Sequence, residues 1–154
     1  MSTDNDTRSS GEVQRVVIVS CTNRKQPEPT QALAMYEPSS YYRKMREYAF
    51  KRADQWFIQS AKHGLLSPME TIEPYDKRAQ DIEEPGRWAS EIATALAEHV
   101  DPPATVEVLG GKAYADPLTP ELEARGFDVV EPMRGMRIGE RQAWLNSHIE
   151  EVTA

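Results

Sequence analysis

Short apolar runs predict four β-strands, at residues 15–20, 55–60, 105–109 and 127–131. The first run is β-branched over residues 16–19 and does not alternate with polar residues, which is typical of a strand buried on both faces of a parallel sheet. Helical spacing of apolar residues predicts four helices, at residues 41–53, 86–100, 117–125 and 138–152. Because strands that alternate with helices form βαβ units, we expect an α/β fold. The expected architecture is a single three-layer α/β/α domain with a mostly parallel sheet of about four strands.

Two long connections interrupt this alternation. Residues 26–37 are rich in Pro and Gln, and residues 61–85 contain many turn residues, so both are predicted to be loops. A loop as long as the second one is either functional or disordered. The polar residues 1–12 are expected to form a disordered N-terminal tail, which leaves residues 13–154 as the domain.

Composition narrows the classes of function. The formal net charge of −7 opposes non-specific binding to nucleic acid by the protein as a whole, but it leaves a local basic groove open. The acidic balance fits either an ordinary cytoplasmic protein or adaptation to high salt. No apolar run approaches the ~20 residues that span a bilayer, so no membrane partner is expected. The single cysteine excludes an internal disulfide and fits a reducing, cytoplasmic compartment, and we expect no metal and no cofactor.

Each predicted strand leads into a loop that carries a basic residue. Lys25 follows the first strand, Lys62 the second, Lys112 the third and Arg134 the fourth. In an open α/β sheet the carboxyl ends of the strands gather at one edge, where ligands of this architecture bind. Cations at that edge of an acidic protein indicate an anionic ligand, a nucleotide or another phosphate-bearing small molecule.

The loop after the first strand combines hydroxyls with two cations. Ser20 and Cys21 end the strand, and Arg24 and Lys25 would hold phosphate or carboxylate oxygens. The spacing of a P-loop is absent. Cys21 is either a nucleophile, for which His63 is the candidate base, or a small buried residue at the strand end.

The loop after the second strand is the most distinctive stretch of the chain. Ser60, Lys62, His63 and Gly64 follow the strand directly. The charge of Lys62 would hold the pKa of His63 down and keep the imidazole neutral. The alternative interpretation is that Lys62 and His63 are solvated loop residues.

An aromatic residue and a carboxylate stand together in the long connection that follows. Tyr75 offers a face for a base, and Asp76 offers a carboxylate for acid–base chemistry, although Asp76 also suits a helix N-cap or a turn. Earlier in the chain, the helix 41–53 interleaves basic residues with tyrosines. That pattern fits either a surface that follows a nucleic-acid backbone or a solvated helix face.

The loops after the third and fourth strands add glycines and further cations. Gly110 and Gly111 allow close approach of the backbone to a ligand, and Lys112 and Tyr114 follow them, although a plain tight turn also explains the glycines. Arg134 is suited to a bidentate contact with phosphate or carboxylate.

These motifs resemble an uncharacterised domain family of bacteria, archaea and phages. The family pattern is Ser-Cys-x-x-(Arg/Lys)-Lys, Tyr-x-(Pro/Gly)-Ser, Ser-Ala-Lys-His-Gly-Leu-Leu, Pro-Tyr-Asp, Gly-Gly-x-x-Tyr and Gly-Ile-Gly-x-x-x-x-Trp-Leu. In this chain it stands as Ser20 to Lys25, Tyr36 to Ser39, Ser60 to Leu66, Pro74 to Asp76, Gly110 to Tyr114, and Arg137 to Leu145. The last motif departs from the family in having Arg137 in place of the first glycine.

The family is distantly similar to the uracil-DNA-glycosylase-like domain of archaeosine synthase. That similarity implies a three-layer domain that handles nucleobases, nucleotides or modified nucleic acid. The Gly-x-Asp-Pro-x signature of the glycosylases is absent after the first strand, so their classical mechanism is not implied.

The residues favour an enzyme that acts at the N-glycosidic bond of a nucleotide, nucleoside or modified base. Asp76 would stabilise the oxocarbenium-like centre or activate water, and His63, tuned by Lys62, would protonate or hydrogen-bond the departing base. Tyr75 would stack on the base. The residues expected to contact the ligand are Ser20, Cys21, Arg24, Lys25, Ser60, Gly64, Tyr75, Gly110, Gly111, Lys112, Tyr114 and Arg134. The alternative is a non-catalytic module that binds a nucleotide or single-stranded nucleic acid.

Overall fold

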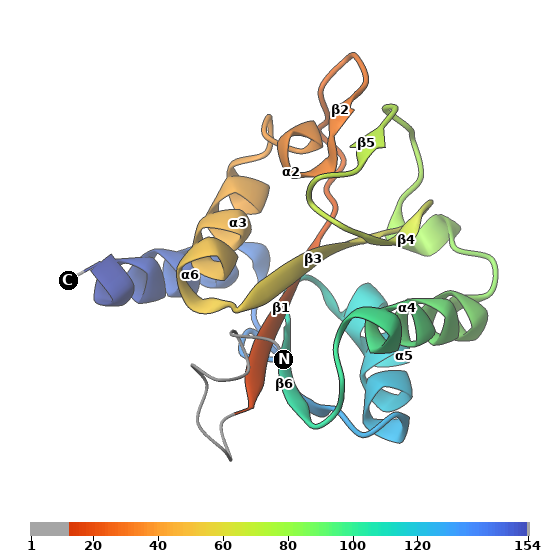
Figure 1. Ribbon diagram of the computed structural model, residues 1–154. Coiled ribbons are helices and arrows are strands. Elements are labelled where there is room, and N and C mark those ends of the chain that lie inside the picture. Colours follow the sequence, from red (N-terminus) through yellow and green to blue (C-terminus); the bar gives the residue numbers. More distant parts are fainter. Residues whose placement is uncertain (1–12, 154) are drawn as a thin grey trace, which may run out of the picture.

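Five strands form the main sheet, in the order β4-β3-β1-β6-β7 (Figure 1). The computed structural model describes residues 13–153, with side chains up to residue 150, so the predicted tail at residues 1–12 lies outside the described residues. The strands are β1 Gln14–Ser20, β3 Gln55–Ser60, β4 Gly64–Leu66, β6 Ala104–Val108 and β7 Asp128–Val130. All neighbours pair in parallel except β3 with β4. The predicted α/β class and mostly parallel sheet are confirmed.

The additional strand, β4, lies within the region predicted to be a loop. It returns antiparallel to β3, with Gly64 opposite Ser60. Gly64 has a φ of +73°, a conformation that glycine adopts without strain at such a turn. Three residues are too few to show the two-residue period of a strand, so the sequence pattern did not reveal β4.

The two predicted loops are joined by a small second sheet. β2, Thr30–Gln31, pairs antiparallel with β5, Thr71–Ile72. A short helix, α2 (Ala32–Met35), and a 3₁₀ turn, η1 (Ala79–Asp81), complete these regions. The prediction of plain loops was therefore wrong in part, because strands of two residues form only through pairing with a distant segment.

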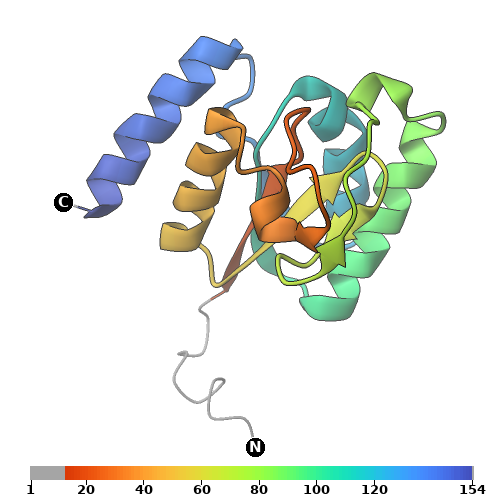
Figure 2. The same cartoon turned by 90° about the horizontal axis from the view of Figure 1, so that it is seen from above.

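Four longer helices flank the main sheet, α3 Ser40–Arg52, α4 Pro85–His99, α5 Lys112–Ala124 and α6 Ile138–Thr153. α3 packs against α6, and α4 packs against α5. Figure 2 shows the two pairs on opposite sides of the sheet. α3 begins one residue before the predicted start at residue 41, because the Ser39 hydroxyl caps the helix by accepting a hydrogen bond from the Tyr42 N–H at 3.1 Å.

Side chains of β1 alternate between two apolar cores. Val17 and Val19 pack in the core that includes α3 and Leu145 of α6, whereas Val16 and Ile18 pack in the core that includes α4 and α5. All four side chains are fully buried. This explains why the first apolar run shows no alternation of polar residues.

One helix boundary differs in a way that matters for the site. The sequence predicts a helix from residue 117, but α5 begins at Lys112 and contains Pro117 and Pro120 in its interior. Each proline lacks the N–H of an i→i−4 hydrogen bond, so the pattern indicated a helix start at Pro117. The true start places the N-terminus of α5 directly after Gly110 and Gly111.

Candidate functional site

The carboxyl ends of β1, β3, β6 and β7 lie at one edge of the sheet. Ser20 is paired with Gln59, and the Cys21 N–H donates to the Gln59 carbonyl at 3.0 Å. Gly110 lies against the end of β1, where an added Cβ would stand 2.7 Å from the Ser20 Cβ at a φ of +117°. Only glycine fits this approach. The loops that carry the predicted site residues therefore meet at this edge.

Five residues form a connected group that we name the Tyr75 cluster: Lys25, His63 and Tyr75 from three loops, Ser60 at the end of β3 and Tyr36 at the C-cap of α2. The Tyr75 hydroxyl lies 2.7 Å from both the Tyr36 hydroxyl and the Ser60 hydroxyl. The Lys25 Nζ lies 4.5 Å from the centroid of the Tyr75 ring, and the His63 ring meets Tyr75 edge-on at 5.2 Å. The structure thus brings together residues that are far apart in the sequence.

Backbone groups set the direction of the hydrogen bonds in this cluster. The Ser60 oxygen accepts from the Lys62 N–H at 3.2 Å and the His63 N–H at 3.0 Å. These two bonds occupy both of its lone pairs, so the Ser60 hydroxyl donates to Tyr75. The Tyr75 hydroxyl shares its other hydrogen bond with the Tyr36 hydroxyl. Ser60 therefore links the Lys62–His63 turn to Tyr75 and, through it, to the buried Tyr36.

Cys21 and Tyr114 form a second pair beside this cluster. Their Sγ and hydroxyl oxygen are 3.2 Å apart, and the thiol is buried. The Tyr114 ring packs against Trp88, whose indole N–H donates to the Ser60 carbonyl at 2.9 Å. The hydrogen-bond partner of Cys21 is thus Tyr114, whereas His63, its candidate base, contacts Tyr75.

Burial shifts several protonation equilibria here. It lowers the pKa of Lys25, although the nearby Cys21 thiol and the Asp76 carboxyl oppose this effect. It also lowers the pKa of His63, and the charge of Lys62 lowers it further while Glu70 raises it. Burial, with the Cys21 thiol nearby, raises the pKa of Tyr75 well above its ordinary value. At neutral pH the cluster therefore contains a neutral imidazole and neutral phenols.

The remaining predicted residues of these loops lie at the surface. Lys62 is exposed, and its Nζ lies 6.0 Å from the Tyr75 ring centroid. Asp76 is exposed and close enough to Lys25 to raise its pKa. Arg24 is also exposed. The three predicted catalytic residues, Lys62, His63 and Asp76, thus surround Tyr75, and their catalytic roles stay predictions.

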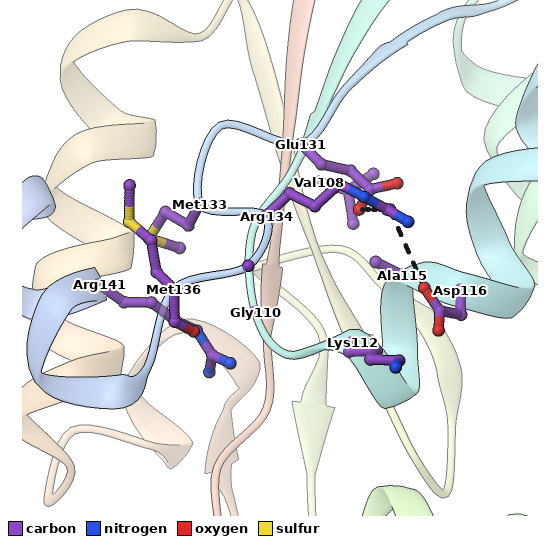
Figure 3. Close-up of a pocket in the computed structure, with 11 residues that line it drawn as sticks. Val108, Gly110, Lys112, Ala115, Asp116, Glu131, Met133, Arg134, Met136 and Arg141 are labelled. Atoms are coloured by element: carbon purple, nitrogen blue, oxygen red, sulfur yellow. Dashed lines mark hydrogen bonds and ion pairs between the residues drawn. The ribbon is translucent and has the colours of Figure 1, made fainter.

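A cleft of about 360 Å³ opens at the same edge of the sheet, between the ends of β6 and β7. We name it the β6–β7 cleft. Its lining residues are Val108, Gly110, Lys112, Ala115, Asp116, Glu131, Met133, Arg134, Gly135, Met136 and Arg141 (Figure 3). Lys112, Gly110 and Arg134 were predicted to bind a ligand. The lining joins an apolar surface to three cations, which suits an anionic molecule that also carries an apolar ring.

Arg141 is the functional candidate that the sequence analysis missed. Its Nε donates to the Met136 carbonyl at 3.0 Å, and this bond turns the guanidinium toward the start of α5. The Nη1 and Nη2 atoms lie 3.6 and 3.9 Å from the point that a Cβ on Gly111 would occupy. In the sequence, Arg141 has the appearance of an ordinary charged residue of the last helix, and only the fold of the preceding loop reveals its position.

The basic face of α3 is engaged within the protein. Arg46 pairs with the Glu37 carboxylate at 2.8 Å, and Arg43 donates to the Glu37 carbonyl. Lys44 donates to the Gln142 side chain at 3.0 Å, and the Arg52 guanidinium lies 4.9 Å from the Tyr48 ring centroid. These contacts favour the solvated, structural interpretation of this helix over a track for nucleic acid.

Two further features are absent from the described part of the chain. Within residues 13–153 no group of three or more His, Cys, Asp or Glu side chains is placed to hold a metal ion. None of the helices formed by these residues has the length and apolar character needed to cross a membrane.

The fold and the site define an α/β protein with a cation-lined cleft at the carboxyl edge of its sheet. Residues 16–147 match a family of unknown function, DUF6884, and the chain belongs to this family. No curated protein and no solved structure shows a significant match to the chain. The expected membership of an uncharacterised family is thus confirmed, and the similarity to archaeosine synthase stays a prediction.

Proposed function

We propose that the protein is an enzyme that binds a nucleotide or modified nucleoside and acts at its N-glycosidic bond. The observation that carries this proposal is that two features, a cleft and a cluster of polar side chains, lie at the same edge of the sheet. The β6–β7 cleft offers cations and an apolar lining, and the Tyr75 cluster gathers an imidazole and, close by, the Asp76 carboxylate. The distant resemblance to the uracil-DNA-glycosylase-like domain of archaeosine synthase, which stays a prediction, points to the same class of ligand.

The proposed chemistry divides between two groups. Asp76, exposed at the rim, stabilises the oxocarbenium-like centre or activates water for attack at C1′. His63 hydrogen-bonds the departing base, and its lowered pKa keeps the imidazole neutral near pH 7. Tyr75, with Lys25 over its ring, orients His63 through the edge-on contact. Stacking of Tyr75 on a base would require Lys25 to move away from the ring.

Release of free base tests the proposal directly. The purified chain is incubated with nucleotides, nucleosides and short single-stranded oligonucleotides, and the released base is measured by chromatography. Asp76→Asn should lower release at least ~100-fold, as expected for loss of an acid–base group, while ligand binding persists. His63→Ala should also lower release. Glu83→Gln, which removes an exposed carboxylate of the same connection to α4, serves as the matched control and should release base normally.

A binding module without chemistry is the second candidate. One observation favours it: the Tyr75 hydroxyl is hydrogen-bonded within the protein to both the Ser60 and the Tyr36 hydroxyls. Such a network can serve stability alone. Tight, salt-sensitive binding of one ligand with no released base, in the native chain and in Asp76→Asn alike, would establish the binding module and overturn the enzyme.

A further inference from the structure

The two sides of the β6–β7 cleft differ in charge. Arg134 lies 2.7 Å from the Glu131 carboxylate and 3.9 Å from the Asp116 carboxylate. Figure 3 shows this side of the cleft with its two dashed contacts, and Arg141 on the opposite side. Neither Lys112 nor Arg141 has a carboxylate within 4.0 Å among the described side chains. The uncompensated positive charge of the cleft therefore belongs to Lys112 and Arg141.

The Arg141 guanidinium is held in place before any ligand binds. Its Nε is fixed by the Met136 carbonyl, and its outer nitrogens face the backbone of Gly111. The buried hydroxyl of Tyr41, from α3, lies beside the same guanidinium and has no well-formed hydrogen bond among the described residues. A held guanidinium binds phosphate with less loss of side-chain entropy than a mobile one.

The start of α5 adds backbone donors at the same place. Gly111 is the N-cap of this 13-residue helix and supplies no side-chain cap. The Gly111 carbonyl accepts from Tyr114 and Ala115, which leaves the N–H groups of the first helical residues directed outward beside Lys112. Helix N-termini attract anions through such donors and through the helix dipole.

The size of the cleft limits the ligand. At about 360 Å³ it lies at the lower end of the range of small-molecule pockets, so it suits one mononucleotide and not an oligonucleotide. Met133 and Met136 are adaptable apolar surfaces for a planar ring. At the end away from Arg141, the Glu131 carboxylate is engaged by Arg134 and Thr119, and the exposed Asp116 carboxylate can accept a hydrogen bond from a ligand.

We infer that Lys112, Arg141 and the N-terminus of α5 form the phosphate subsite of a nucleoside monophosphate, and that Arg134 lies outside this subsite. The inference rests on the proposed nucleotide ligand and adds the residues that select a phosphorylated form. Tyr41 acts as a positioning residue for Arg141.

Calorimetric titration of the full chain tests this assignment. The probes are adenosine and uridine 5′-monophosphates, each compared with its nucleoside. The native chain should bind one monophosphate about tenfold or more tightly than its nucleoside, as expected for charge-assisted hydrogen bonds to phosphate. Arg141→Gln and Lys112→Gln should each remove most of this ratio, and Arg134→Gln should keep it. Tyr41→Phe should reduce the ratio partly while nucleoside affinity stays unchanged.

Two controls separate the site from general effects. Arg137→Gln makes the same change of charge at an exposed residue just before α6 and outside the cleft lining, and it should keep the native ratio. Arg141→Lys retains the charge and should keep part of the ratio, which separates a local loss from misfolding. A native ratio near one, an unchanged ratio in both Arg141→Gln and Lys112→Gln, or an equal loss in Arg137→Gln would overturn the assignment.

The outcomes also separate this inference from the proposed function. Base release from nucleosides with no preference for monophosphates would keep the enzyme and overturn the phosphate subsite. Preferential binding of a monophosphate without base release would keep the subsite and overturn the enzyme.

Discussion

The Tyr75 cluster and the β6–β7 cleft lie at the same sheet edge but are built differently. In the cluster the hydroxyls bond to each other, and Lys25 is held over an aromatic ring. In the cleft, Lys112 and Arg141 face open space without an acidic partner among the described residues. The comparison teaches that a basic residue after a parallel strand is not by itself a ligand-binding residue. Its neighbours decide whether the charge is available.

Gly110 lines the cleft and lies against Ser20 at the end of β1, and its substitution should give the largest effect. Gly110→Ala places a Cβ 2.7 Å from the Ser20 Cβ at a φ of +117°, so both backbone strain and a clash result. We expect a loss of about 3 kcal/mol or more in the free energy of unfolding, measured by urea denaturation.

Two other glycines serve as controls for this change. Gly135→Ala has a φ of +81° but open space around the Cβ, so only strain of about 1 kcal/mol is expected. Gly139→Ala lies near the start of α6 with nothing within 4 Å and should be neutral or slightly stabilising. Equal effects at Gly110 and Gly135 would show that the close approach of Gly110 to β1 is not significant.

Two substitutions should show that the cluster contributes to stability whereas the cleft contributes to ligand binding. Tyr75→Phe removes the hydroxyl that bridges Ser60 and Tyr36, so we expect a loss of about 1–3 kcal/mol in the free energy of unfolding. Lys112→Gln, at an exposed side chain, should change that free energy by at most about 0.5 kcal/mol and act on ligand affinity instead. A destabilised Lys112→Gln with a native-like Tyr75→Phe would reverse the comparison.

The sequence predicted most of the strands and long helices, but fewer of the contacts between side chains of the site. The run Val16–Val19 indicated a buried parallel strand because both its faces are apolar, and β3 has the predicted bounds. The loops that follow these strands therefore lie together at the carboxyl edge of the sheet, as predicted. The pattern did not place Tyr36 beside Tyr75, because that contact depends on α2 and on pairing between two-residue strands.

Arg141 shows the same limit in the cleft. Its role depends on the turn in which the Met136 N–H bonds to the Met133 carbonyl, since this turn presents the Met136 carbonyl to Arg141. Neither periodicity nor composition encodes such a contact. Local pattern thus predicts which strand ends converge, whereas the set of side chains that share one cavity is fixed by tertiary structure.

The protonation of His63 gives the smallest expected effect and reports on the cluster alone. Burial and the Lys62 charge place the pKa of His63 below 6.5. Because the folded state then binds this proton less readily than the unfolded chain, protonation of His63 reduces stability as the pH falls through 6.5 and below. Lys62→Gln should raise the pKa of His63, and Glu70→Gln should lower it by less, because the Lys62 charge is the larger of the two effects.

NMR titration of the imidazole protons measures these shifts, with His63→Gln used for assignment. Lys112→Gln, in the cleft, should leave the His63 titration unchanged, because Lys112 is absent from the groups that perturb this pKa. A His63 pKa at or above 6.5, or a shift caused by Lys112→Gln that equals the one caused by Lys62→Gln, would show that the two regions share one electrostatic environment. The division between a closed cluster and an open cleft would then no longer hold.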